Sequence, residues 1–295
     1  MPAAVIADVI GAVEGWYDPR WAESWDAVGL VCGRPDTPVS RVVLAVDAVP
    51  ATVTEAGGAQ LLLTHHPLLL SAVHGVPVTD PKGALVDRMI RADLAHYVAH
   101  TNAEVGPDGV SDALAATLGV LGVVPIEAVP APGAVGVGRV GELDEASTLG
   151  QFAALVAGRL PATVGGVRFS GDPERPVRRV AVLGGSGSSL VGAARDAGAD
   201  VFVTADLKHH HAVEAVTQRA GWQAAGSDAS PPMALIDVAH WASEVPWLNR
   251  LARRLRAEFG DTVDVTVSDV VTDPWTGHIP SSPTPTPTPT PDEGS

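Results

Sequence analysis

The chain has 295 residues, of which 46% are hydrophobic, and a formal net charge of −15. This length and apolar content suffice to bury a large core and to form two lobes. The acidic balance argues against nucleic-acid binding, because clustered lysine and arginine side chains are what bind a phosphate backbone. The single cysteine, Cys32, excludes a disulfide framework and a cysteine-built zinc site, and it fits a cytoplasmic protein. Any bound metal must therefore be held by histidine and carboxylate side chains.

The N-terminal stretch predicts an amphipathic helix and no export signal. It lacks a basic region, and Val5, Val9, Val13 and Trp16 recur at helical spacing. The most apolar long stretch, residues 119–138, contains three prolines and many glycines, so it is not an ordinary membrane span. We therefore expect no membrane partner.

Further along the chain, short runs rich in Val, Leu and Ile alternate with helical patterns. Such alternation is typical of an α/β protein with buried strands. One of the intervening helices has clear start signals, with Asp80 as its N-cap and Pro81 in its first turn. The predicted strands are RVVLAVD (41–47), QLLLTHH (60–66), AHYVAHTN (95–102), RRVAVLGG (178–185), DVFVTAD (200–206) and MALIDVAH (233–240).

Two composition changes divide the chain. A Gly- and Pro-rich segment near residues 122–140 marks the passage between two lobes, which we place at 1–130 and 131–278. Residues 279–295 alternate Pro and Thr with almost nothing to bury, so we expect a disordered tail. The two lobes share a strand–helix rhythm, and we expect them to be similar and to face a common cleft.

Polar side chains follow the predicted strands with unusual regularity. In open α/β sheets the carboxyl ends of strands face the ligand crevice. The residues at these ends are Asp47, His65, His66, His100, Thr101, Asn102, Asp206 and His240, with Glu104 and Glu244 nearby. A lone histidine at a strand end is usually a hydrogen-bonded structural residue. Several histidines at separate strand ends, with carboxylates close by, favour a metal site instead.

The spacing of these residues suits two ions. Adjacent His65 and His66 point to opposite sides of an extended backbone, so each would bind a different ion once the chain turns at Pro67. His240 and Glu244 lie four residues apart and share one face of a helix that begins near His240. A carboxylate can bridge two cations, and Glu104 would add another oxygen ligand. The set suffices for a dinuclear centre with open positions for water.

Two other polar stretches are ambiguous. His209, His210 and His211 would radiate around a helix and cannot converge on one ion, so we read Asp206, Lys208 and His209 as walls of the crevice. The GGSGSS stretch at 184–189 follows a strand and precedes a helix. It fits either an anion-binding turn or a plain tight turn, since it lacks the lysine of a P-loop.

The same stretches resemble a known family. WDAVGLVCG, LLLTHHPLLL, AHTNAEVGPDGVSDALA, ADVFVTADLKHHHAVEA, ALIDVAHWASE and VTDPW occur in the order seen in NGG-interacting-factor-three-like proteins, also called dinuclear metal centre proteins or GTP cyclohydrolase 1 type 2 homologues. The resemblance covers nearly the whole chain short of the tail. It implies two α/β lobes facing a cleft with two divalent cations (Zn, Fe or Mn), assembled as a homohexamer.

The resemblance also implies a ligand set. His65 and His66 correspond to ligands of separate ions, Glu104 to an oxygen ligand, His240 to a nitrogen ligand and Glu244 to the bridge. The family usually has aspartate where this chain has Glu104, so the longer side chain must bend differently or bind through water. Ala205 replaces a usual glycine and narrows the backbone freedom before Asp206.

Two functions follow as hypotheses. The first is a metal-dependent hydrolase, possibly of the GTP cyclohydrolase type, that activates water against a nucleotide or phosphoester, with Asp206, Lys208 and His209 assisting as proton shuttle or phosphate contact. The second is a non-catalytic, metal-loaded ring that serves as scaffold or regulatory partner. A weaker third reading is redox iron storage.

Overall fold

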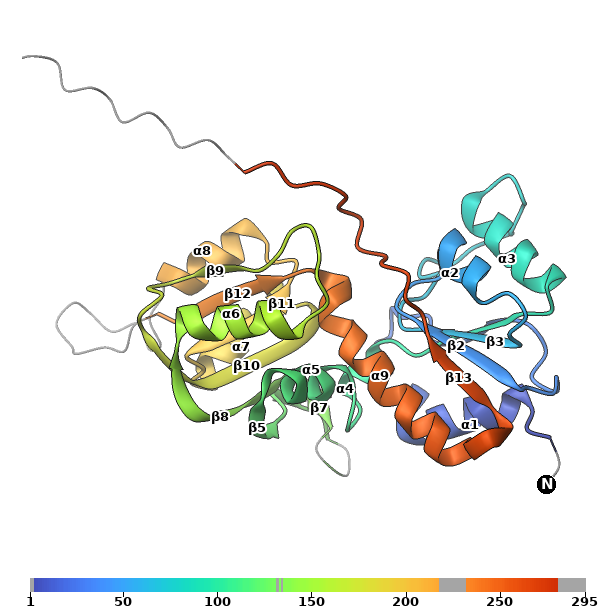
Figure 1. The fold of residues 1–295 in the computed structure, drawn as a ribbon, viewed down its shortest axis with the longest axis horizontal. Helices are drawn as coiled ribbons and strands as arrows, with labels where there is room; N and C mark the ends of the chain where they lie inside the picture. The colour runs from blue at the N-terminus through green and yellow to red at the C-terminus, as the bar shows by residue number, and fades with distance from the viewer. Residues whose placement is uncertain (1–2, 131–132, 134, 218–231, 281–295) are drawn as a thin grey trace, which may run out of the picture.

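The structure is a computed structural model that describes residues 3–130, 133, 135–217 and 232–280. Figure 1 shows two α/β bodies, with the long helix α9 (His240–Phe259) running between them. Each body is built on one mixed sheet. The predicted α/β class is therefore confirmed. Of the tail predicted to be disordered, residues 281–295 lie outside the described part of the chain.

The first sheet has the strand order β1-β4-β3-β2-β13. Its strands from β4 to β13 are parallel, and β1 pairs antiparallel with β4. Helices α1 and α9 pack on one face of the sheet, and α2 and α3 pack on the other. The bounds are α1 Ile6–Trp16, β1 Gly29–Cys32, β2 Arg41–Ala45, α2 Pro50–Glu55, β3 Leu61–Thr64, α3 Pro81–Arg91, β4 Ala95–Val98 and β13 Asp264–Val267.

The second sheet has the strand order β5-β8-β10-β11-β12-β9, of which β10, β11 and β12 are parallel. Helices α5 and α6 cover one face, and α7 and α8 cover the other. The bounds are α5 Val110–Leu118, β5 Val120–Val124, β8 Arg139–Thr148, α6 Leu149–Arg159, β9 Arg168–Ser170, β10 Pro176–Ser186, α7 Val191–Asp196, β11 Val201–Ala205, α8 His209–Thr217 and β12 Ala234–Val238.

Short elements complete the described chain. Helix α4 follows β4 and supplies residues discussed below. The two-residue strands β6 and β7 pair with each other. The bounds are η1 Pro19–Trp21, α4 Thr101–Val105, β6 Glu127–Ala128, β7 Gly136–Val137, η2 Ser188–Leu190 and η3 Gly260–Thr262.

All six runs predicted as strands form strands β2, β3, β4, β10, β11 and β12. Residues of β2 alternate between two cores: Val42 and Leu44 face α1 and α9, whereas Val43 and Ala45 face α2 and α3. Both faces are therefore apolar, which is why these strands read as continuous hydrophobic runs. The predicted start of α3 is also confirmed, since Asp80 accepts hydrogen bonds from the backbone N–H groups of Lys82 and Gly83.

Each of the two sheets contains one strand from the part of the sequence that forms most of the other sheet. Strand β5, which precedes the expected boundary at residue 130, pairs in the second sheet. Strand β13, near the C-terminus, returns to pair in the first sheet, and α9 packs in the first core. The polypeptide therefore crosses between the bodies more than once, which places residues of distant segments against each other. Within the described residues, no helix is both long and apolar enough to cross a membrane.

A buried arginine ties the second sheet to α5. The Arg139 side chain is 1% exposed, and its guanidinium donates to both carboxylate oxygens of Asp112, at 2.8 and 2.7 Å. It also donates to the carbonyl oxygens of Gly106, Gly136 and Gly138. Burying this charge is tolerable only because so many acceptors surround it.

Replacing this arginine should destabilise the protein strongly. In Arg139→Met, the Asp112 carboxylate loses its charged partner and keeps only the Gly109 N–H, and we expect the free energy of unfolding to fall by about 3–5 kcal/mol. The matched control is Arg178→Met, whose side chain is 61% exposed and pairs with Glu142, and it should cost about 0–1 kcal/mol. Urea titration of the metal-free protein, followed by circular dichroism, measures both. Equal losses in the two variants would contradict this role.

Candidate metal centre

Four histidines and two glutamates converge between the two sheets. His65 and His66 directly follow β3, and His100 is the residue before α4, which itself contains Glu104. His240 is the first residue of α9, and Glu244 follows one turn later, as the spacing of four predicted. These residues come from strand ends of both sheets, because β3 and β4 belong to the first sheet and β12, which leads into α9, belongs to the second.

Glu244 lies at the centre of the group and is 1% exposed. Its carboxylate oxygens lie 3.0 Å from His240 Nε2, 3.3 Å from His66 Nε2 and 3.5 Å from His65 Nε2. None of these contacts has hydrogen-bond geometry, so both Glu244 oxygens and His65 Nε2 are buried without a hydrogen-bond partner. Orphaned buried acceptors are costly, and their convergence on one point is what a bound cation would satisfy.

In each of the four histidines, Nδ1 lies within hydrogen-bonding distance of an oxygen acceptor. His65 Nδ1 lies 3.0 Å from the Ala99 carbonyl oxygen, and a carbonyl can only accept. The Nδ1 atoms of the other three histidines lie 2.6–2.8 Å from aspartate oxygens; these pairs are His66 with Asp47, His100 with Asp26, and His240 with Asp206. Each neutral ring therefore carries its proton on Nδ1 and presents the Nε2 lone pair inward, which is the state that binds a metal.

The carboxylates of the cluster also stabilise positive charge on its histidines. Burial alone would lower the pKa of His66, but the Glu244 carboxylate and Asp47 outweigh it and raise that pKa to about 11. Burial likewise opposes charge on His65 and His240, yet Glu244 raises the pKa of each to about 9. Burial would raise the pKa of Glu244, and the three histidines hold it well below the usual range. Protons thus occupy the site when no other cation does.

Three overlapping triads in the described chain have ligand atoms within 4.8 Å of one another. The Glu104 carboxylate reaches the cluster, with Oε1 3.7 Å from His65 Nε2 and 3.9 Å from His100 Nε2. The longer side chain at this position is therefore accommodated. The triads are His65–His66–His100, His66–His240–Glu244 and His65–Glu104–Glu244. They could hold a metal, and all five residues expected as ligands belong to at least one of them.

The GGSGSS stretch forms the wall behind Glu244. Gly185 in β10 has a positive φ of +77°, and a Cβ atom there would lie 2.7 Å from Glu244 Oε1 and 3.3 Å from His240 Nε2. Its N–H donates to Ser243 Oγ, and its carbonyl accepts from Thr204 Oγ1. The glycine is therefore required by the close approach of the backbone to the cluster.

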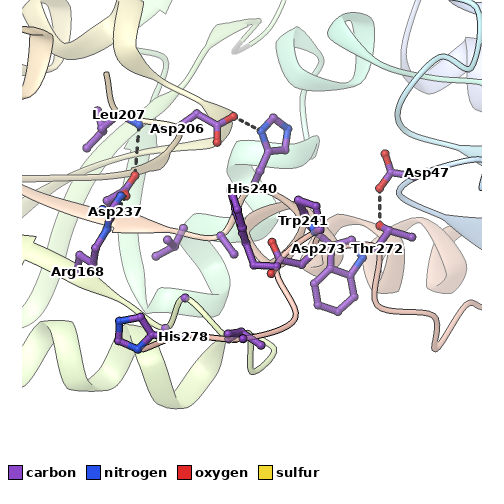
Figure 2. A pocket seen from close by; sticks show the side chains of 18 of the residues that line it. Asp47, Arg168, Asp206, Leu207, Asp237, His240, Trp241, Thr272, Asp273 and His278 are labelled. Carbon is purple, nitrogen blue, oxygen red and sulfur yellow. Dashed lines mark hydrogen bonds and ion pairs between the residues drawn. The ribbon is translucent and has the colours of Figure 1, made fainter. Parts of the chain in front are cut away.

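Two cavities open beside the cluster, and His240 lines both. The larger, of about 730 Å³, also includes His66 and residues of the C-terminal strap, by which we mean residues 269–280 after β13. Figure 2 shows this strap cavity, with the Asp206 carboxylate bonded to His240 and the Asp47 carboxylate bonded to Thr272 of the strap. The smaller, of about 430 Å³, is lined by Trp25, His100 and Glu104, and we call it the α4 cavity.

Of the three residues expected to assist catalysis, Asp206 lies at the cluster and Lys208 and His209 do not. Asp206 lines the strap cavity and orients His240. Lys208 and His209 line neither of these two cavities; the Lys208 N–H bonds to Ser188 Oγ, and His209 begins α8 with its ring against His210. The geometry therefore gives only Asp206 a contact with the cluster.

Sequence reasoning missed two parts of the cluster. His100 was recognised as a strand-end residue but not as a ligand, although its Nε2 belongs to one of the triads. Asp26 precedes β1 and lies 74 positions from its partner His100, so no local pattern could have found it. Asp26 also accepts from the Thr101 N–H and hydroxyl.

Comparison with known proteins finds relatives along nearly the whole chain. A "GTP cyclohydrolase 1 type 2 homolog" from Streptomyces coelicolor is 46% identical over 286 residues, which cover 95% of this chain and 96% of the relative. One from Mycobacterium leprae is 36% identical, covering 92% of this chain and 95% of the relative.

Solved structures show the same fold. A Staphylococcus aureus hypothetical protein matches with a TM-score of 0.80 at 28% identity, covering 93% of this chain and 99% of that chain. A Bacillus cereus protein related to NIF3 matches with a TM-score of 0.80 at 23% identity, covering 94% and 100%. The model of the family described as Duf34/NIF3 (NGG1p interacting factor 3) matches residues 4–274. The chain therefore belongs to the Duf34/NIF3 family.

Proposed function

We propose that this protein is a hydrolase that depends on two divalent cations held between its lobes. The observation that carries the proposal is the buried, unpartnered set of His65 Nε2 and both Glu244 oxygens. The donor set is made of imidazole and carboxylate groups, which suits zinc, iron or manganese alike. Glu244 belongs to two of the three triads and lies within 3.5 Å of three imidazole nitrogens, so it would be the residue that holds both cations.

Divalent cations in such a site supply a Lewis acid and a water of lowered pKa. The chain's own residues supply the geometry. Asp47 and Asp206 accept from His66 and His240, which fixes the direction of both Nε2 atoms. Gly185 leaves room for Glu244. Asp206 is thus a positioning residue, and our proposal does not draw on Lys208 or His209.

Because His240 lines both cavities, a small molecule in either one would lie beside the cluster. The name of the relatives suggests a nucleotide, and we propose a nucleotide or phosphoester as the substrate. We further propose that the chain works as a cytoplasmic homohexamer. A non-catalytic metal-binding scaffold is the second candidate, favoured by the burial of His65 and Glu244, which are 0% and 1% exposed.

The first test combines metal content with turnover. Glu244→Gln removes the central charge while keeping the volume of the side chain, so bound metal should fall below one ion per chain. Hydrolysis should fall by at least about 100-fold, since even outer partners of metal ligands are worth 10–100-fold in affinity. The matched control is Glu214→Gln, on the exposed face of α8, and it should behave as wild type. Elemental analysis and a screen of nucleotides and phosphoesters, with and without chelator, provide the readouts.

The outcome of that screen separates the two candidates. Turnover that disappears on chelation supports the hydrolase. Full metal loading with no turnover under any metal would instead establish the scaffold. Normal metal content in Glu244→Gln would contradict the proposed site itself.

Metal affinity should rise with pH. The raised pKa values of His65, His66 and His240 mean that protons must leave before a cation binds. We therefore expect binding to tighten as pH rises toward about 9, and the number of protons released on binding to fall only as pH passes through about 9. Calorimetry in buffers of different ionisation enthalpy counts the released protons.

The stability of the metal-free protein should fall as pH rises, which is opposite to the pH dependence of metal affinity. A raised pKa in the folded state contributes stability that is present below the unfolded pKa and is lost as pH rises through the folded value. Metal-free protein should therefore melt at a lower temperature at pH 10 than at pH 7, and bound metal should remove this difference. A melting temperature independent of both pH and metal would contradict the assignment.

Adding one methyl group at position 185 should weaken metal binding. In Gly185→Ala the new Cβ would lie 2.7 Å from Glu244 Oε1, at a φ of +77° that disfavours alanine. We expect a loss of affinity of at least about tenfold, in the range seen for disturbed ligand support. Gly192→Ala in α7 is the control, because a Cβ there has nothing within 4 Å. Unchanged metal affinity in Gly185→Ala would show that the close approach of Gly185 to Glu244 is not needed for metal binding.

A further inference from the structure

The C-terminal strap is hydrogen-bonded to the support of a proposed metal ligand. Asp47 follows β2, and its Oδ1 lies 2.8 Å from His66 Nδ1. Its Oδ2 accepts a hydrogen bond from the Thr272 hydroxyl of the strap, as Figure 2 shows. One carboxylate therefore contacts the histidine through one oxygen and the strap through the other. Because it treats His66 as a ligand, this inference rests on the proposed function.

Thr272 makes the last hydrogen bond along the strap. Directly before the strap, the Ser268 hydroxyl donates to the Glu55 carboxylate of α2. Beyond Thr272, residues 273–280 make no hydrogen bond to any other described residue, although several of them line the strap cavity. The bond to Asp47 is therefore the hydrogen bond that fixes this wall of the cavity.

The main chain at Asp47 is held independently of the strap. Thr52 Oγ1, in the first turn of α2, donates to the Asp47 carbonyl oxygen at 2.8 Å. The hydrogen bonds to the Asp47 carboxylate, within the described chain, come from His66 and Thr272. Without Thr272 the carboxylate could rotate while the main chain stayed in place, and His66 Nδ1 would lose a fixed acceptor.

The docked strap also carries an unfavourable contact. Asp273 follows Thr272, and its Oδ2 is buried without a hydrogen-bond partner. An unpartnered buried acceptor and a hydrogen bond to a charged carboxylate contribute free energies of similar size and opposite sign. The two contributions nearly cancel, so a modest change at Asp47 is enough to shift the balance between docked and released strap.

We propose that the Thr272–Asp47 hydrogen bond couples docking of the strap to metal binding at His66. A bound cation fixes the His66 ring through Nε2, and a fixed ring keeps Nδ1 directed at Asp47. The coupling is reciprocal, because the factor by which the docked strap raises metal affinity is also the factor by which metal favours docking. Thr272 is thus a positioning residue, and metal loading completes the strap wall of the cavity.

Substitutions at Thr272 separate its hydroxyl from its shape. Thr272→Val removes the hydroxyl and keeps the branched side chain, Thr272→Ala removes both, and Thr272→Ser keeps the hydroxyl. The matched control is Thr262→Val, because the exposed Thr262 hydroxyl donates to the Phe259 carbonyl at the end of α9. Zinc affinity of the full chain is measured by competition with a chromophoric chelator.

We expect Thr272→Val and Thr272→Ala to weaken zinc binding by about tenfold, the low end for the loss of an outer partner of a metal ligand. Thr272→Ser should stay within about threefold of wild type, because it retains the hydrogen bond. Thr262→Val should bind zinc as wild type does. A purely structural role would lower the melting temperature of Thr272→Val without changing its zinc affinity.

Cleavage by chymotrypsin after Trp275 reports release of the strap. Trp275 is 69% exposed, but a protease also binds residues on both sides of the cleaved bond, so Thr272 must leave Asp47. The cleavage rate then follows the population of released strap. Saturating zinc should slow this cut about tenfold in wild type and Thr272→Ser, matching the affinity factor. In Thr272→Val zinc should not change the rate, and mass spectrometry identifies the cut.

Three results would overturn the proposal. The first is wild-type zinc affinity in both Thr272→Val and Thr272→Ala. The second is equal slowing of cleavage by zinc in wild type and Thr272→Val. The third is an affinity loss in Thr272→Ser as large as that in Thr272→Val, which would assign the effect to packing.

The hydrolase proposal fails separately. If the strap responds to zinc as predicted but no substrate is turned over with any metal, the coupling stands and the catalytic function does not. If metal-dependent turnover occurs and Thr272→Val matches wild type in zinc affinity and cleavage, the catalytic function stands and the coupling does not. A wild-type protein that binds no zinc at the cluster would overturn both.

Discussion

The burial of one carboxylate among inward-facing imidazole nitrogens is the constraint on which the site depends. Glu244 is 1% exposed, and three histidine Nε2 atoms lie within 3.5 Å of its oxygens. His66 Nε2 and His240 Nε2 are themselves only 3.2 Å apart. Lone pairs this close repel one another unless a proton or a metal ion lies among them, and a buried charge without a partner is strongly destabilising. The cluster therefore requires positive charge to be stable.

The fold meets this requirement from both of its sheets. Parallel strands end at the same edge, so β3 and β4 deliver His65, His66 and His100 together. Helix α9 starts at the opposite sheet with His240 and then packs through the first core. Its position is fixed by Trp247, which is fully buried and lies 5.1 Å from the His65 ring. Core packing and ligand geometry are thus set by the same helix.

Local patterns predicted much of this arrangement. The strands were recognisable because both faces are apolar, and the His240–Glu244 pair was recognisable because helical spacing alone places four-apart residues on one face. Contacts without a local signature were not predictable. The Asp26–His100 bond joins residues 74 positions apart, and the role of Gly185 depends on how closely β10 approaches Glu244. Lys208 and His209 follow Asp206 in the sequence, but the chain turns at Asp206, whose φ is +53°, and α8 then begins outside the two cavities beside the cluster.

The most direct measurement of the central claim is anomalous X-ray diffraction from metal-loaded crystals at the absorption edge of the bound metal. The account predicts two peaks about 3.5–4 Å apart, the usual separation in two-metal sites, on either side of the Glu244 carboxylate and within bonding distance of the His65 and His66 Nε2 atoms. Peaks located only at the histidines of α8, or none near Glu244 in crystals that contain metal, would contradict it.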